Sequence, residues 1–108
     1  MKDSFINELY DKLKKRQKAD VKDSYTSQLI KDPDLLAKKL GEETSELIID
    51  FIKRNKSGVV KESADLLYHL LVIWLSMGVN PKDIWTELNE RRSLSGVEEK
   101  KRRKYMNE

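Results

Sequence analysis

The chain has 108 residues, of which 38% are charged and 38% are hydrophobic, and its formal net charge is +3. This length accommodates one modest core, so residues 1–108 are expected to form a single domain. The chain contains no cysteine, which excludes disulfides and thiolate metal sites. The longest apolar run, residues 66–75, is about half the length that spans a bilayer. We therefore expect a cytoplasmic protein without membrane contact.

Helical periodicity dominates the chain, and no segment alternates as a strand would. The first predicted helix covers residues 3–17 and places its apolar side chains on one face. The polar segment 18–32 is interpreted as a loop with one short helical turn. Asp32 and Pro33 are a typical N-cap and first-turn pair, so a second helix is expected from there to about Lys53.

A turn at residues 55–58 leads into a third predicted helix, which covers 57–77. Gly78 stands where a glycine commonly ends a helix. Asn80 and Pro81 repeat the start signal and open a fourth helix. Its buried stripe is expected to contain Ile84, Trp85 and Leu88.

The C-terminal segment 96–108 is a basic tail, and the spacing of Ser95 and Glu98 is that of a capping box, which predicts a short terminal helix. The expected fold is an all-α bundle of about four main helices plus this short helix. After Leu66 the third helix is apolar nearly all the way round. So short a chain has too few other helices to cover it, so a second copy is expected to complete the bundle as a homodimer or a higher oligomer.

Acidic residues stand where the second and third helices should be apolar. At about 100° per residue, Glu43 projects into the apolar stripe of its helix and Glu46 lies at the edge. Glu62 and Asp65 share one face of the third helix, one turn apart. Four anions facing one another inside a bundle repel unless protons or a cation neutralise them. Oxygen ligands alone favour a hard cation, magnesium first and manganese second.

From the residues alone, a second interpretation of these acids stays open, because an acidic string on a helix is commonly a solvated face. Glu42 points away from the stripe and is interpreted as an ion-pair partner of Lys38 or Lys39. A magnesium site of carboxylates normally leaves positions for water and phosphates, which favours phosphate-ester or diphosphate chemistry.

Two motifs, E-E-x-x-E in "GEETSE" and E-x-x-D in "ESAD", resemble the MazG-type all-α nucleotide pyrophosphohydrolases. Within that superfamily, the order of four segments is similar to the phosphoribosyl-ATP pyrophosphohydrolase family over about residues 5–103. These segments are "SYTSQL", "KKLGEETSELII", "KESADLLYHLLV" and "ERRSLSGVEEK". The chain departs from that pattern in lacking an aromatic-glycine pair after its arginines and a proline before "SYT". Both departures affect loop conformation.

The resemblance implies a MazG-like fold and the second step of histidine biosynthesis. In that step, phosphoribosyl-ATP and water give phosphoribosyl-AMP and diphosphate with the help of magnesium. Matched by position, the metal ligands would be Glu43, Glu46, Glu62 and Asp65, the four that helical geometry selects. Glu42 matches the first glutamate of the motif and is assigned, with Glu43, to the catalytic group as a residue that orients water.

Basic and hydroxyl side chains are the candidate contacts to the substrate phosphates. For the "SYT" hydroxyls, turn capping is an equal alternative, and any single basic residue could be a solvated charge. We expect the tail from Ser95 onward to read the second ribose phosphate, because a helix N-terminus and arginines bind anions. The candidates are Arg16, Ser24, Tyr25, Thr26, Lys39, Arg91, Arg92, Ser95, Gly96, Lys100 and Arg103.

The remaining distinctive residues favour structural roles. His69 is expected to be a hydrogen-bonded core residue. Trp74 and Trp85 are expected in the core or at the dimer interface.

Two other functions compete with this interpretation. A housecleaning pyrophosphatase would use the same metal site on simple nucleoside triphosphates. A nucleic-acid-binding module would use the basic segment 100–104, but inward carboxylates have no purpose there, so no nucleic-acid partner is expected. Whether a phosphoribosyl-AMP cyclohydrolase docks on the protein stays open.

Overall fold

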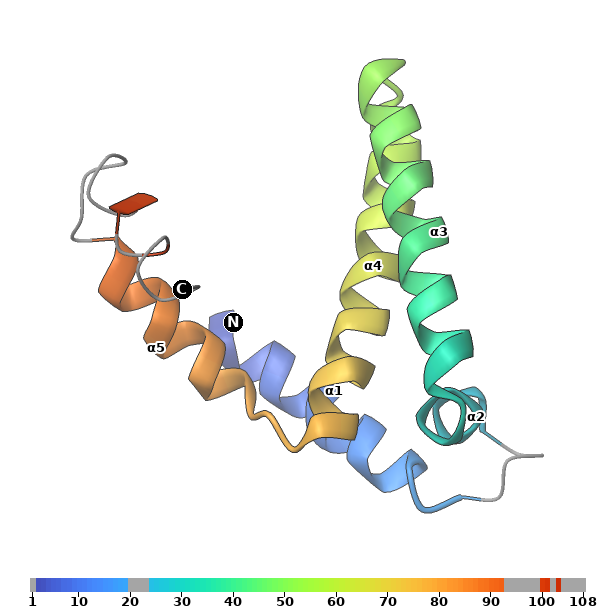
Figure 1. Ribbon diagram of the computed structural model, residues 1–108, viewed down its shortest axis with the longest axis vertical. Coiled ribbons are helices and arrows are strands. Elements are labelled where there is room, and N and C mark those ends of the chain that lie inside the picture. The colour runs from blue at the N-terminus through green and yellow to red at the C-terminus, as the bar shows by residue number, and fades with distance from the viewer. Residues whose placement is uncertain (1, 20–23, 93–99, 102, 104–108) are drawn as a thin grey trace.

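The computed structural model describes residues 2–19, 24–92, 100–101 and 103, and all the elements within them are α-helices (Figure 1). The predicted all-α class is thereby confirmed. No helix in these ranges has the length and apolarity needed to cross a membrane. The helices are α1 (Lys2–Arg16), α2 (Tyr25–Lys31), α3 (Pro33–Ile52), α4 (Lys56–Met77) and α5 (Pro81–Arg91).

Helices α3 and α4 form a long antiparallel hairpin, the upright pair in Figure 1. Helix α3 begins where the sequence predicts, because the Asp32 side chain accepts a hydrogen bond from the Leu35 backbone N–H at 3.1 Å and Pro33 follows it. Helix α4 begins at Lys56, one residue earlier than predicted, because Asn55 is its N-cap and accepts from the Gly58 N–H at 3.1 Å. The connecting turn is therefore tighter than the predicted 55–58.

Both helices of the hairpin end with a left-handed residue and paired backbone hydrogen bonds. At the end of α3 this residue is Arg54, with φ of 58°, and at the end of α4 it is Gly78, with φ of 70°. The Asn55 N–H donates to the Asp50 carbonyl at 2.9 Å, and the Val79 N–H donates to the Trp74 carbonyl at 2.8 Å. These bonds satisfy carbonyls that a helix end leaves without a partner.

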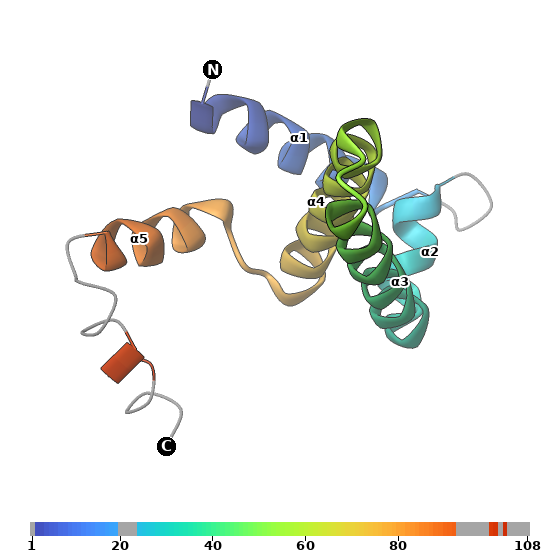
Figure 2. The same ribbon diagram turned by 90° about the horizontal axis from the view of Figure 1, so that it is seen from above.

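The core lies at the base of the hairpin, where α1 and α2 pack against it (Figure 2). Leu13 of α1, Leu29 of α2, and Leu71 and Val72 of α4 are completely buried there, and Leu36 of α3 is almost completely buried. Helix α2 is the main departure from the predicted organisation, since the sequence predicted one helical turn within a loop. It is longer because its Leu29 fills the core and Ser24 caps its first turn by accepting from the Ser27 N–H at 3.1 Å.

Helix α5 follows a short turn, meets α1 and α4 near its own start, and then extends away from the hairpin (Figures 1 and 2). Asn80 and Asp83 form a capping box at its start, as the Asn80-Pro81 signal predicts. Trp85 meets Trp74 edge to face, with ring centroids 6.3 Å apart. The expectation that Leu88 is buried is wrong, because its side chain is 52% exposed. The predicted helix at Ser95 lies outside the described residues.

Candidate active site

The four predicted metal ligands lie on the facing sides of α3 and α4, near the middle of the hairpin. Glu43 and Glu46 belong to α3, and Glu62 and Asp65 belong to α4. One carboxylate oxygen of each of Glu43, Glu62 and Asp65 lies within 4.8 Å of the other two. The i, i+3 spacing on α4 makes this possible, because it stacks Glu62 and Asp65 on one face. Three of the four side chains therefore form a group that could surround one cation; we call these three the carboxylate cluster.

Two oxygens of the carboxylate cluster are buried without a donor. Oε2 of Glu43 and Oε2 of Glu62 have no hydrogen-bond partner among the described residues. A buried carboxylate oxygen without a donor is costly, and two carboxylates cannot donate to each other unless a proton is shared. A shared proton, a water molecule or a cation can satisfy these oxygens, and only the proton or the cation also reduces the repulsion between the two carboxylates. A hard divalent cation with oxygen ligands fits this donor set.

The proximity of the acids also shifts the pKa values of two of them. The hydrogen-bonding contact with Glu62, and then the charge of Glu62, raise the pKa of Glu46 above its ordinary value. The contact with Glu43 raises the pKa of Glu62 in the same way, with a further contribution from burial. Glu46 is exposed, lies at the edge of the carboxylate cluster as helical geometry predicts, and interacts with it through Glu62.

Glu42 lies on the outer side of α3. Its carboxylate pairs with the Lys39 ammonium at 3.5 Å, which confirms the ion-pair interpretation and identifies Lys39 as the partner. Lys39 was also a candidate phosphate contact. In this structure its charge is already shared with Glu42, at a solvent-exposed pair that contributes little to stability.

The "SYT" residues lie at the start of α2, beside a pocket of about 350 Å³. Arg16, Ala19, Ser24, Tyr25, Thr26 and Tyr68 line it. Ser24 caps α2, Thr26 Oγ1 lies 2.7 Å from the Tyr68 hydroxyl, and the Tyr25 hydroxyl lies 3.4 Å from His69 Nε2, so all three hydroxyls make hydrogen bonds within the fold. The third residue, Tyr25, is 44% exposed. Turn capping is thus observed for Ser24.

His69 lies between this pocket and the carboxylate cluster. It is 5% exposed, and its Nδ1 lies 2.7 Å from the Asp65 carbonyl oxygen. A carbonyl oxygen only accepts, so Nδ1 carries the proton of that bond. Nε2 lies 3.4 Å from the Tyr25 hydroxyl. The expectation of a hydrogen-bonded core histidine is confirmed.

The other basic candidates lie on α5 and beyond it, which both views place apart from the hairpin (Figures 1 and 2). Arg91 Nε donates to Glu87 at 2.9 Å, and Arg92 is exposed. Lys100 and Arg103 are exposed helical residues. Within one chain, the structure does not bring these four side chains beside the carboxylate cluster. Ser95 and Gly96 lie outside the described residues.

Sequence reasoning missed Tyr68. It lies three residues after Asp65 on α4, so the same spacing that relates Glu62 to Asp65 also relates Asp65 to Tyr68. Its apolar neighbours concealed it, because an aromatic in such a run is normally a core residue. Its partners on α2, Tyr25 and Thr26, are more than forty residues away in the chain.

Two comparisons identify relatives of this chain. The family model described as phosphoribosyl-ATP pyrophosphohydrolase matches residues 6–92. The match includes α2, the carboxylate cluster and α5. It ends before the basic tail.

Several curated proteins named phosphoribosyl-ATP pyrophosphatase are similar over most of the chain. The one from Gluconobacter oxydans is 40% identical over 96 residues, which are 88% of this chain and 72% of that protein. The one from Azospirillum brasilense is 39% identical over 100 residues, covering 92% of this chain and 90% of that protein. The one from Paramagnetospirillum magneticum is 41% identical over 99 residues, or 91% of each chain.

Proposed function

Because this chain belongs to the phosphoribosyl-ATP pyrophosphohydrolase family, we propose that the carboxylate cluster is the site where it hydrolyses phosphoribosyl-ATP. The products are phosphoribosyl-AMP and diphosphate, in the second step of histidine biosynthesis. The observation that carries the assignment is the pair of buried oxygens, on Glu43 and Glu62, that have no donor among the described residues. Such a pair destabilises a fold until a partner such as a cation satisfies it, and proteins commonly retain such a cost at a functional site.

In this proposal Glu43, Glu46, Glu62 and Asp65 hold Mg²⁺, for which Mn²⁺ can substitute. The ion would supply positive charge to the phosphate oxygens and would make a water molecule more acidic. Glu43 borders the reacting phosphate and accepts a hydrogen bond from the attacking water. Glu42 is assigned to orient that water, which requires it to leave Lys39. The water oxygen forms a bond to a phosphorus at the α–β bridge and loses a proton to solvent, while the bridging P–O bond breaks and diphosphate leaves.

The substrate carries a triphosphate and a separate ribose phosphate, so several cationic contacts are needed. Arg16 is the candidate best supported within one chain, because it lines the pocket beside Tyr25 and Tyr68. The hydroxyls of Ser24 and Thr26 border the same pocket. The remaining candidates are proposed to reach the substrate phosphates only in an assembly of two or more copies. They are Arg91, Arg92, Ser95, Gly96, Lys100 and Arg103.

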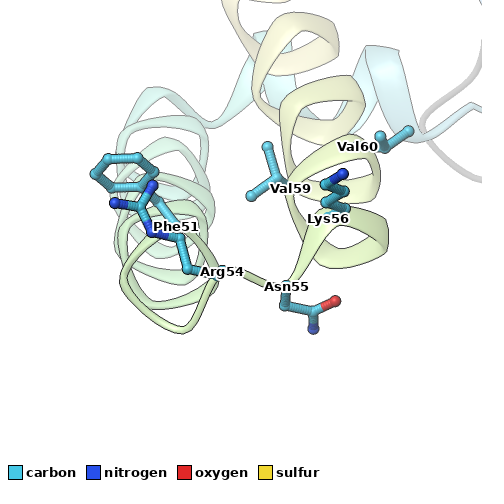
Figure 3. Close-up of a pocket in the computed structure, with 6 residues that line it drawn as sticks. All are labelled: Phe51, Arg54, Asn55, Lys56, Val59 and Val60. Carbon is cyan, nitrogen blue, oxygen red and sulfur yellow. The ribbon is translucent and has the colours of Figure 1, made fainter.

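A homodimer is proposed because the hairpin tip exposes apolar side chains. Phe51, Ile52 and Val60 are 57%, 71% and 69% exposed. Figure 3 shows the pocket at this tip, about 410 Å³ in volume, with Arg54 lying over the Phe51 ring. The radius of gyration is 16.1 Å, whereas a compact chain of this length has about 13 Å. A second copy packed along the hairpin would cover these side chains, as a helical bundle requires.

The domain organisation, location and partner proposed here are those expected of a member of this family. We propose one domain over residues 1–108 and a cytoplasmic location. A phosphoribosyl-AMP cyclohydrolase is a proposed partner, because it would consume the product.

The deciding assay measures diphosphate release from phosphoribosyl-ATP, ATP and dUTP, with Mg²⁺ and with a chelator. We expect Mg²⁺-dependent release that is much faster from phosphoribosyl-ATP. Equal release from all three substrates would instead identify a housecleaning pyrophosphatase. Sedimentation at micromolar concentration tests the dimer, and a folded monomer there would contradict it.

A further inference from the structure

The pocket beside α2 carries an aromatic pair that the carboxylate chemistry does not use. The rings of Tyr25 and Tyr68 are 13° from parallel, with centroids 6.2 Å apart. The His69 ring meets both edge on, at 6.1 Å from Tyr25 and 5.1 Å from Tyr68. The two tyrosines come from different helices, and Tyr25 keeps 44% of its surface open to solvent. A flat ligand can therefore reach an aromatic surface here.

This aromatic pair is held rigidly before any ligand arrives. Thr26 is 2% exposed, and its hydroxyl lies 2.7 Å from that of Tyr68. Ser27, also on α2, is completely buried and donates through its hydroxyl to the Ala19 carbonyl at 2.9 Å. The first contact holds the Tyr68 hydroxyl, and the second ties α2 to the segment that follows α1. A pre-organised surface binds a ligand with a smaller entropic cost.

The pocket lies close to the carboxylate cluster. Tyr68 follows Asp65 by three residues and Glu62 by six, which corresponds to about 4.5 Å and about 9 Å along the helix axis. His69, next to Tyr68, donates to the Asp65 backbone. Tyr68 is about 60° around the helix from Asp65, so a nucleotide whose phosphates lie at the carboxylates can extend its base and sugars around α4 toward the tyrosines.

Arg16 supplies positive charge at the same pocket. It lines the cavity with Tyr25 and Tyr68. Among the described residues, no ion pair involves Arg16. The pocket thus offers electron-rich ring faces beside a guanidinium, which suits a ligand with a flat ring next to an anionic group.

Phosphoribosyl-ATP has a flat ring with an anionic group attached directly to it, and ATP does not. Its additional ribose phosphate is attached to N1 of adenine, and substitution there makes the ring a stronger base that carries a proton near neutral pH. Tyrosine faces attract a flat cation more strongly than a neutral ring. The attached phosphate is an anion of the kind that arginine binds. ATP has neither the cationic ring nor the second phosphate.

We propose that Tyr25 and Tyr68 bind the N1-substituted adenine ring and select it over unsubstituted adenine, with Arg16 placed to meet the attached ribose phosphate. This inference rests on the proposed function and adds its specificity-determining residues. Thr26 is a positioning residue that acts through Tyr68. The tyrosines contact the ring, whereas the triphosphate would bind through the cation that the carboxylate cluster would hold.

The test uses a probe that separates the ring from the ribose phosphate. ATP methylated at N1 has the cationic ring but no second ribose. For the wild-type protein, we expect KM to be lower for 1-methyl-ATP than for ATP. Tyr25→Ala should raise KM for 1-methyl-ATP and for phosphoribosyl-ATP roughly three- to thirtyfold, the loss of one cation–π contact. It should change KM for ATP much less and leave kcat nearly unchanged.

Two variants make the result specific. Tyr25→Phe keeps the ring and should retain the preference for 1-methyl-ATP. Phe5→Ala removes a similarly exposed aromatic from α1, 54% exposed and outside the pocket, and should leave both KM values unchanged. Circular dichroism verifies that each variant is folded.

The outcomes distinguish this inference from the proposed function. If the wild-type protein does not hydrolyse phosphoribosyl-ATP, the proposed function fails, and the inference fails with it. If the wild-type protein is active but Tyr25→Ala keeps the preference for 1-methyl-ATP over ATP, only the inference is overturned. An equal rise in KM for ATP and 1-methyl-ATP would also overturn it, because that would indicate a general effect of the substitution.

Discussion

The two ends of the α3–α4 hairpin have similar apolar sequences but very different surroundings. At the base, Leu36 is 5% exposed and Leu71 is completely buried, because α1 and α2 pack there. At the tip, Phe51, Ile52 and Val60 are more than half exposed. The carboxylate cluster lies between these two regions. The comparison shows that apolar periodicity specifies a face to be covered, whereas the number of neighbouring helices decides whether the same chain can cover it.

The residues that stabilise the fold and the residues proposed for catalysis lie in different parts of the hairpin. The base contains the buried core cluster, and the described residues place the unpartnered carboxylate oxygens farther along the hairpin. A short chain that uses part of its two longest helices for an acidic site has less apolar surface for its own core. The following predictions test this division, starting with the largest expected effect.

The first prediction concerns the carboxylate cluster. Glu43→Gln and Asp65→Asn each remove one charge without changing shape, and should lower turnover roughly a thousandfold or more, because several kcal/mol of metal-dependent stabilisation is lost. The fold should persist, since neither side chain belongs to the buried core. Diphosphate release and circular dichroism are the measurements, with Glu8→Gln on α1 as the control. Near-normal turnover in both variants would contradict the site assignment.

The second prediction compares the base with the tip. Leu71→Ala opens a cavity in the completely buried core and should lower the free energy of unfolding by about 2–5 kcal/mol. Ile52→Ala changes a side chain that is 71% exposed within one chain. Its cost should be below about 0.5 kcal/mol in a monomer and larger in an assembly that buries the tip. Urea unfolding at two protein concentrations measures both, and a Leu71→Ala cost as small as that of Ile52→Ala would contradict the division.

The third prediction concerns pH in the presence of a chelator. The contacts among the acids raise the pKa values of Glu46 and Glu62 in the folded state. The folded protein therefore binds more protons than the unfolded chain, and its stability must fall as pH rises from the ordinary glutamate range through these raised values. Glu62→Gln should flatten this dependence. A melting temperature that rises with pH in this range, in the wild type but not in Glu62→Gln, would contradict the interpretation.

The smallest predicted effect compares the two helix ends. Gly78 and Arg54 both have left-handed backbones, which suit glycine. Gly78→Ala should lower stability by about 1 kcal/mol. Arg54→Gly should raise it by less than about 1 kcal/mol. The relief of backbone strain is partly offset because the contact between the guanidinium and the Phe51 ring, 5.0 Å away, is lost. Thermal unfolding measures both, and a destabilised Arg54→Gly would show that the ring contact dominates.

Helix boundaries and the face of each acid were predictable from the sequence, because both depend on residues within about one turn. Asp32-Pro33, Gly78 and Asn80-Pro81 marked helix ends that the structure confirms. Helical geometry also placed Glu62 and Asp65 on one face, with Glu43 facing inward from the preceding helix. Their meeting within 4.8 Å follows from the shortness of the turn between the two helices.

Tertiary structure alone decided which surfaces meet across long stretches of chain. Helix α2 is longer than its local sequence predicts, because its stability comes from burying Leu29 against other helices. The hydrogen bond between Tyr68 and Thr26 joins residues 42 positions apart, and no local sequence pattern predicts it. Leu88 continues the apolar stripe of α5 yet is exposed, because α5 extends away from the other helices after its Trp85 has met Trp74. In each case the deciding quantity is the surface that a distant helix provides, which periodicity within one segment does not contain.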